Sequence, residues 1–168
     1  MALNATIGSV TSNSYVTLAE AEAYFEDRFF ASAWVALTDI VKEQLLVSCS
    51  QMLDWYLKWK GTKTSTTQFM LWPREGALRA DGEEIEDDII PPELKVAVYE
   101  LVISSIAADR MEDDPLAGLG SVKVGPLTVM AGPEKPNQTT KKAIPEKIRM
   151  ILKDITSGSG GVVRLLRA

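Results

Sequence analysis

The segment from Pro91 to Ile106 constrains the fold more than any other part of the chain. Pro91 and Pro92 open it, and proline is tolerated in the first turn of a helix. A helix that is apolar nearly all round is buried nearly all round. The segment therefore predicts either a central helix wrapped by the other elements or a helix that also faces another subunit. Its apolar residues are Leu94, Val96, Ala97, Val98, Tyr99, Leu101, Val102, Ile103 and Ile106.

Three further helices are expected around this one. A capping box at residues 17–20 starts the first, which runs to about Phe30. Thr38 caps the second, which should end near residues 60–61, where glycine suits the position after a helix. The last starts at residues 144–145 and has isoleucine and leucine on one face.

After the central helix the apolar period changes to that of strands. Two short strands with a turn at Gly125–Pro126 predict a β-hairpin at about residues 121–131. An isolated hairpin is marginal in water, so it needs this domain, a neighbouring subunit or a partner to lie on. We expect a subunit interface on its apolar residues, Val122, Val124, Leu127 and Val129.

The predicted fold is therefore mainly α: a four-helix bundle with a small β-hairpin and an extended C-terminal tail. Residues 1–156 are expected to form the helical domain, and residues 157–168 a linker and docking tail. Residues 1–13 are small and polar, and we expect them to be poorly ordered.

The residue types limit the chemistry. The chain has no histidine, which removes the usual general base, the usual zinc ligand and every Ser-His or Cys-His dyad. Its single cysteine, Cys49, lies in an apolar helical pattern, which favours a buried thiol. The acidic run at residues 81–88 lacks the ligand spacing of an EF-hand, so a solvated loop is expected. We expect no enzyme, no catalytic residue, no metal site and no cofactor.

No membrane contact is expected either. No apolar run approaches the roughly 18–20 residues of a membrane span. The N-terminus lacks the basic start and apolar block of a signal peptide. The sequence thus predicts a cytosolic or assembly-site protein.

Charge is distributed unevenly along the chain. Residues 1–133 carry 10 lysines and arginines against 20 acids, a balance of −10, and residues 134–168 carry 8 against 3, a balance of +5. An acidic body with a basic end suggests either a partner or nucleic acid for that end, or simply a solvated basic helix face and a frayed terminus.

The C-terminal tail combines apolar and basic residues behind a glycine-serine linker at residues 157–161. Apolar side chains are costly to leave in water, and this composition suits strand addition to the sheet edge of another chain. The alternative is a frayed terminus with no binding role. The tail residues are Val162, Val163, Arg164, Leu165, Leu166 and Arg167.

The segment FMLWPREGA, residues 69–77, allows two interpretations. In the first, Phe69 and Trp72 fold under the helices, Pro73 fixes the turn, and Arg74 pairs with a carboxylate or stacks on a ring. In the second, Phe69, Trp72 and Arg74 stack on the bases of single-stranded DNA. A strand-binding groove needs many cations along its path, and the acidic body favours the first interpretation.

Several segments, in this order, resemble the phage protein family described as DnaT-like single-stranded DNA binding proteins, whose members resemble head–tail connector (adaptor) proteins of tailed phages. The match covers most of the chain. The matching segments are NSYVTLAEAEAY at 13–24, LDWY at 53–56, QFMLWPREGA at 68–77, IPPELKVAVYEL at 90–101, KVGP at 123–126 and VVRLLR at 162–167.

The resemblance implies a structural protein of the virion neck. Such adaptors form a ring, commonly twelve-fold, beneath the portal, and extend the channel through which genomic double-stranded DNA passes without specific binding. It implies portal binding through residues 162–167, with a tail or stopper protein of the neck on the other side. The alternative is a single-stranded DNA-binding replication accessory that uses the basic end with Phe69, Trp72 and Arg74.

Overall fold

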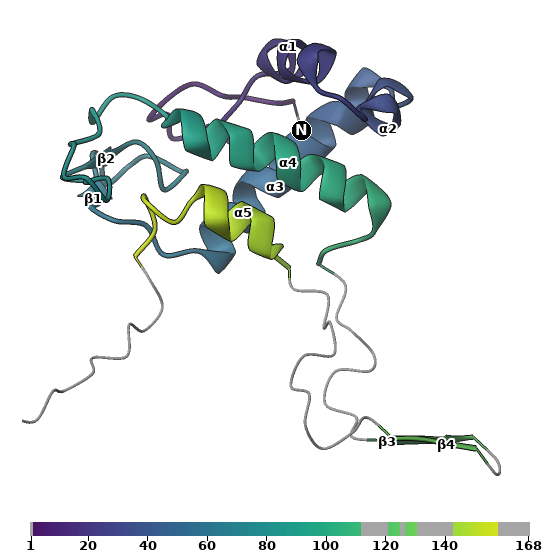
Figure 1. Cartoon of the computed structure of the whole chain (residues 1–168). Coiled ribbons are helices and arrows are strands. Elements are labelled where there is room, and N and C mark those ends of the chain that lie inside the picture. The colour runs from purple at the N-terminus through teal and green to yellow at the C-terminus, as the bar shows by residue number, and fades with distance from the viewer. Residues whose placement is uncertain (1, 112–120, 125–126, 131–142, 158–168) are drawn as a thin grey trace, which may run out of the picture.

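The computed structural model describes residues 2–111, 121–124, 127–130 and 143–157. These residues form a mainly helical fold with two small antiparallel sheets of two strands each (Figure 1). The helices are α1 (Leu18–Asp27), α2 (Ser32–Val35), α3 (Asp39–Tyr56), α4 (Pro92–Ala107) and α5 (Glu146–Ile151). The strands are β1 (Thr62–Lys63), β2 (Arg74–Glu75), β3 (Ser121–Val124) and β4 (Leu127–Met130).

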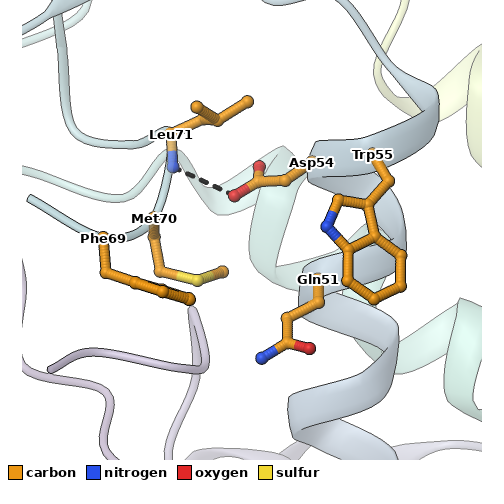
Figure 2. A pocket seen from close by; sticks show the side chains of 6 residues that line it. All are labelled: Gln51, Asp54, Trp55, Phe69, Met70 and Leu71. Atoms are coloured by element: carbon orange, nitrogen blue, oxygen red, sulfur yellow. Dashed lines mark hydrogen bonds between the residues drawn. The ribbon is translucent and has the colours of Figure 1, made fainter.

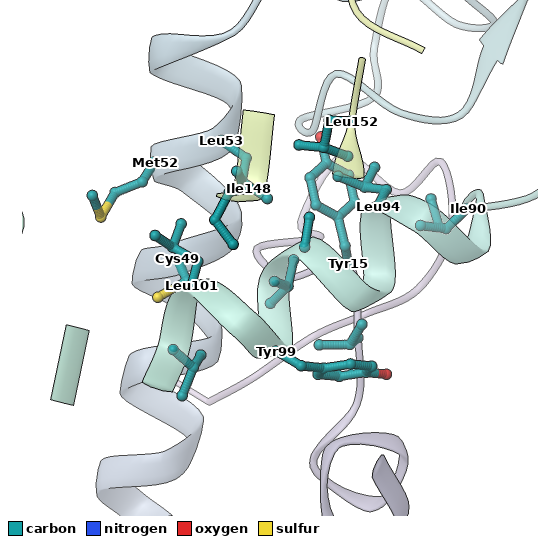
Figure 3. Packing of buried hydrophobic residues seen from close by; sticks show 14 of the residues in the cluster. Tyr15, Cys49, Met52, Leu53, Ile90, Leu94, Tyr99, Leu101, Ile148 and Leu152 are labelled. Atoms are coloured by element: carbon teal, nitrogen blue, oxygen red, sulfur yellow. The ribbon is translucent and has the colours of Figure 1, made fainter. Parts of the chain in front are cut away.

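Helix α4 is the central helix that the sequence predicts. It contacts α3 and α5, and its apolar side chains meet theirs in one core (Figure 3). Leu94, Val98 and Leu101 are fully buried on α4, as are Leu53 on α3 and Ile148 on α5. Burial within the chain therefore accounts for the all-round apolar pattern of α4.

The capping box of α1 is confirmed. The backbone N–H of Glu20 donates to Thr17 Oγ1 at 3.2 Å, and Glu20 Oε2 accepts from the Thr17 N–H at 2.8 Å. The predicted end near Phe30 is wrong, because the helix ends at Asp27 and the chain turns. At that turn Phe30 adopts a φ of 62°, a left-handed conformation that is unfavourable for a residue with a Cβ. The Arg28 guanidinium donates to the Phe29 and Phe30 carbonyls there.

The predicted end of α3 near residues 60–61 is also wrong. The helix stops at Tyr56, and the chain beyond it pairs with the end of the described chain. The Lys60 N–H donates to the Ile155 carbonyl at 3.1 Å, and the Ser157 N–H donates to the Lys58 carbonyl at 2.8 Å. Gly61 has a different role from the one expected. A Cβ there would lie 2.4 Å from the Glu75 carbonyl oxygen, so the close approach of β1 and β2 requires glycine.

The predicted four-helix bundle is not confirmed, since the described residues contain five helices. The short helix α2 was not expected, and one turn of helix gives little periodic signal. The expectation of a poorly ordered N-terminal segment is wrong as well. Asn13 and Ser14 are buried, the Asn4 N–H donates to Asn13 Oδ1 at 2.7 Å, and Ser14 and Ser50 share a hydrogen bond at 3.3 Å. Asparagine, serine and threonine side chains here replace the hydrogen bonds of a regular element.

The two strands of the predicted hairpin are present. Strands β3 and β4 pair antiparallel, with Val122 opposite Val129 and Val124 opposite Leu127. Whether these residues meet a second subunit stays a prediction, as does the division at residue 156. The tail at residues 162–167 lies outside the described residues. In the part of the chain that the structure covers, no helix has the length and apolar character needed to cross a membrane.

Candidate nucleic-acid interface

The structure separates the three residues predicted to contact DNA. Phe69 is 61% exposed, whereas Trp72 is 1% exposed and packs edge-on against Trp59, with ring centroids 6.0 Å apart. The expectation that Phe69 folds under the helices is therefore wrong, and the same expectation for Trp72 is confirmed. Of the two aromatic rings, only that of Phe69 can meet a base without unfolding the loop.

Arg74 is also occupied inside the protein. Its Nε donates to the Lys60 carbonyl at 2.6 Å, and its other nitrogens donate to the carbonyls of Leu71 and Gly61. Desolvation lowers the pKa of this guanidinium, which is only partly exposed. Arg74 thus ties the loop to the chain after α3 through carbonyls, rather than through the carboxylate or ring that we expected.

The neighbours of Phe69 explain why its ring points outward. Gln68 is buried, and its Nε2 donates to the carbonyls of Met70 and Pro73 at 3.0 Å. Met70 is also buried, so the residues on both sides of Phe69 point into the protein while its own ring stays in solvent. The Phe69 N–H donates to the Ser9 carbonyl at 3.2 Å, which fixes its backbone against the N-terminal segment.

A second exposed aromatic residue lies close to Phe69. Trp55, in the last turn of α3, is 62% exposed. The two rings border a pocket of about 200 Å³ (Figure 2). Gln51, Asp54, Met70 and Leu71 complete the lining.

Sequence reasoning did not single out Trp55 as a site residue. A signal was present. The apolar stripe of this helix contains Cys49, Met52 and Leu53, and Trp55 lies two positions after Leu53. Two positions correspond to about 200° around a helix, so Trp55 faces away from the core that Leu53 enters.

Asp54 fixes the floor of the pocket. Its Oδ1 accepts from the Tyr15 hydroxyl and from Trp59 Nε1, the latter at 3.1 Å, and its Oδ2 accepts from the Leu71 N–H at 3.0 Å. Burial raises the pKa of the Asp54 carboxyl, and burial beside this carboxylate raises that of the Tyr15 hydroxyl. The Asp54 side chain therefore joins three segments: the N-terminal segment, α3 and the loop at residues 69–77. These bonds give the pocket a rigid wall.

The described chain ends on the segment that follows α3. Ser157 donates to the Lys58 carbonyl through both its N–H and its Oγ, at 2.8 and 3.1 Å. Lys58 is exposed and lies three residues after Trp55.

The acidic run at residues 81–88 forms a surface loop, as predicted. Its acids are exposed, and Ile85 is the residue that enters the core. The open hollow beside it, of about 660 Å³, is lined by Glu75 and by acids of the run, a surface that repels phosphate. Among the residues that the structure describes, no cluster of side chains has the composition of a metal site. Cys49 is buried, and burial raises the pKa of its thiol to about 12.

A family model matches the chain over its whole length. The family model described as "Putative DnaT-like ssDNA binding protein" matches residues 1–168, and the chain belongs to this family. No curated protein and no solved structure matches the chain.

The family corrects the main functional expectation. Its description names single-stranded DNA binding, and nothing in the match points to a virion connector. The expected connector ring is therefore wrong, together with its portal, tail and stopper or neck partners and its lumen for double-stranded DNA. The connector role was inferred from a resemblance of this family to phage adaptors, and the family match itself does not extend to that role. The predicted absence of enzymatic activity and the virion location stay predictions that neither fold nor family tests.

Proposed function

We propose that this protein binds single-stranded DNA by stacking unpaired bases on Trp55 and Phe69. The observation that supports the proposal is the pair of rings, 62% and 61% exposed, on two sides of one pocket. Base–aromatic stacking contributes about 1–3 kcal/mol per base and tolerates any sequence. The family description agrees with this activity.

The position of these rings meets one requirement for stacking on bases, the exposure of more than one aromatic side chain. A stacking surface needs several exposed aromatic side chains, and Trp72 and Arg74 do not provide one, because they are held inside the protein. Trp55 takes their place beside Phe69. The half-exposed Tyr56 extends the aromatic surface at the end of α3.

The basic end meets a second requirement. A strand-binding protein needs cations to contact the phosphates, and in the acidic body acids outnumber them. Residues 134–168 have a charge balance of +5, whereas the rest of the chain has a balance of −10. In this proposal the cations of residues 134–168 contact the phosphates while the bases stack on the rings. The protein acts in this proposal as a binding protein and carries out no reaction.

The test compares three aromatic substitutions. In a fluorescence-anisotropy titration with a mixed-sequence 20-mer, Trp55→Ala and Phe69→Ala should each weaken binding about tenfold, as the loss of one stacked base predicts. Phe29→Ala is the matched control. Phe29 is 82% exposed and lies in the chain between α1 and α2 (Figure 1), whereas Trp55 is in the last turn of α3.

Equal weakening by all three substitutions would indicate a general loss of apolar surface. Unchanged binding of Trp55→Ala would refute the proposed site. A competition with duplex of the same sequence completes the test, because stacking requires unpaired bases and duplex should compete poorly.

A further inference from the structure

We propose that the pocket between Trp55 and Phe69 accepts one unpaired base and prefers a base with an exocyclic amino group. Asp54 and Gln51 would contact the edge of that base while Trp55 or Phe69 stacks on its face. The inference rests on the proposed function and adds a base preference to a surface that would otherwise be indifferent to sequence.

The pocket has the size and position for one base. Its volume of about 200 Å³ is below the roughly 300–1,000 Å³ of pockets for drug-sized ligands. Gln51, Asp54 and Trp55 are spaced i, i+3 and i+4 on α3, so the three side chains lie on one face of the helix (Figure 2). The opposite side is formed by Phe69, Met70 and Leu71.

Asp54 has one acceptor position left. A carboxylate oxygen accepts two hydrogen bonds. Oδ1 already accepts from Tyr15 and Trp59, but Oδ2 accepts only from the Leu71 N–H among the described residues. A further donor can therefore bind at Oδ2 without displacing any bond of the fold.

Gln51 supplies the complementary group. Its side chain lines the pocket and has no hydrogen bond to any residue that the structure describes. Its amide offers two donors and an acceptor. Because the Gln51 side chain makes no hydrogen bond to the residues that the structure describes, it can turn toward a base at little cost in stability.

The charge of Asp54 decides which part of a nucleotide enters. A phosphate would lie against a carboxylate and be repelled, whereas a neutral base would not. The backbone of the strand must then stay outside the pocket. This orientation places the base edge toward the helix.

Cytosine and uracil separate the edge contacts from stacking. Both are pyrimidines of the same shape. Cytosine presents an amino donor beside the N3 acceptor, which matches Asp54 Oδ2 and the Gln51 NH₂. Uracil presents N3–H between two carbonyl oxygens, so one carbonyl must lie near the carboxylate. A matched edge contact discriminates between bases by a factor on the order of ten.

The experiment titrates the full-length protein with oligo-dC and oligo-dU 12-mers at pH 7.5, which share the same backbone. The parent should bind oligo-dC about five- to tenfold more tightly. Gln51→Leu should reduce this preference to less than about twofold without changing thermal stability, since the Gln51 side chain has no hydrogen-bond partner among the described residues. Asp54→Asn should do the same, with circular dichroism checking that the variant folds.

The outcomes distinguish this inference from the proposed function. Equal binding of the two oligomers, weakened equally by Trp55→Ala, overturns the base preference and leaves the stacking site intact. A cytosine preference that persists in Gln51→Leu and in folded Asp54→Asn overturns the assignment to these side chains. Binding of neither oligomer refutes the proposed function and the base preference with it.

Discussion

Trp72 and Phe69 show how two aromatic residues of one loop divide between core and surface. Trp72 is 1% exposed and Phe69 is 61% exposed. The sequence FMLWP contains both rings, and the aromatic content of the segment does not say which of them enters the core. That choice depends on Gln68, which is buried and holds two carbonyls of its own loop. A polar residue in a polar-looking loop gives no sequence signal for such a role.

Replacing Trp72 tests this division. Trp72→Ala should lower the free energy of unfolding by about 3–5 kcal/mol, as large truncations in a core do. Phe69→Ala should change it by about 0.5 kcal/mol or less, because an exposed ring loses few contacts. Urea denaturation measures both. A Trp72→Ala variant as stable as the parent would contradict the buried position.

At the scale of elements, Glu100 joins three helices. It lies on α4 with its side chain 11% exposed. Its Oε1 accepts from Arg28 Nε at 2.6 Å and from the Tyr24 hydroxyl at 2.8 Å, and its Oε2 pairs with Lys147 of α5. The hydrogen bond from Arg28 is the largest of the effects that lower the pKa of Glu100 from its usual 4.5 to about 2.

The lowered pKa predicts a pH dependence. A carboxyl with a depressed pKa in the folded state adds stability above the unfolded value, and that stability is lost as the pH falls through the folded value. Glu100→Gln should therefore cost about 2–3 kcal/mol at pH 7. The difference from the parent should shrink between about pH 4.5 and pH 2. Thermal denaturation across this pH range measures it.

Glu26→Gln is the control for this effect, because Glu26 is an exposed acid of α1. It should change stability little at either pH. A Glu100→Gln variant whose deficit is the same at pH 7 and at pH 2.5 would contradict the role given to the charge.

The elements also show what local sequence can predict. The capping box at Thr17 and the prolines before α4 act within one turn, and both were predicted correctly. The end of α3 was not, because residues 58–60 leave the helix to pair with residues 155–157, nearly a hundred positions away. The pocket also depends on contacts between separate segments, since Tyr15, Asp54 and Leu71 meet there. Local patterns do not contain those pairings.

At the scale of the whole molecule, the charge asymmetry predicts how binding responds to salt. Cutting the chain after Ser157 removes Arg164 and Arg167 and no acidic side chain. For single strands, each phosphate neutralised changes the slope of log K against log salt by about 0.7. The shortened protein should bind more weakly, and its slope should be smaller by about 1.4. Titrations at several salt concentrations measure this.

Trp55→Ala serves as the comparison, because it should weaken binding and leave the slope unchanged. Stacking releases no counterions, so the two variants separate the apolar part of the affinity from the ionic part. An unchanged slope in the shortened protein would show that its arginines do not reach phosphate.

The anchoring of Ser157 on Lys58 has a consequence for dilute solutions. Arg164 is seven residues beyond Ser157, so it can never be more than about 25 Å from that anchor, whatever path the chain takes. One molecule confined to a sphere of that radius corresponds to an effective concentration on the order of 10 mM. A strand held by the rings would meet the arginine at that concentration even in a nanomolar solution. Weak individual contacts can then combine into useful avidity.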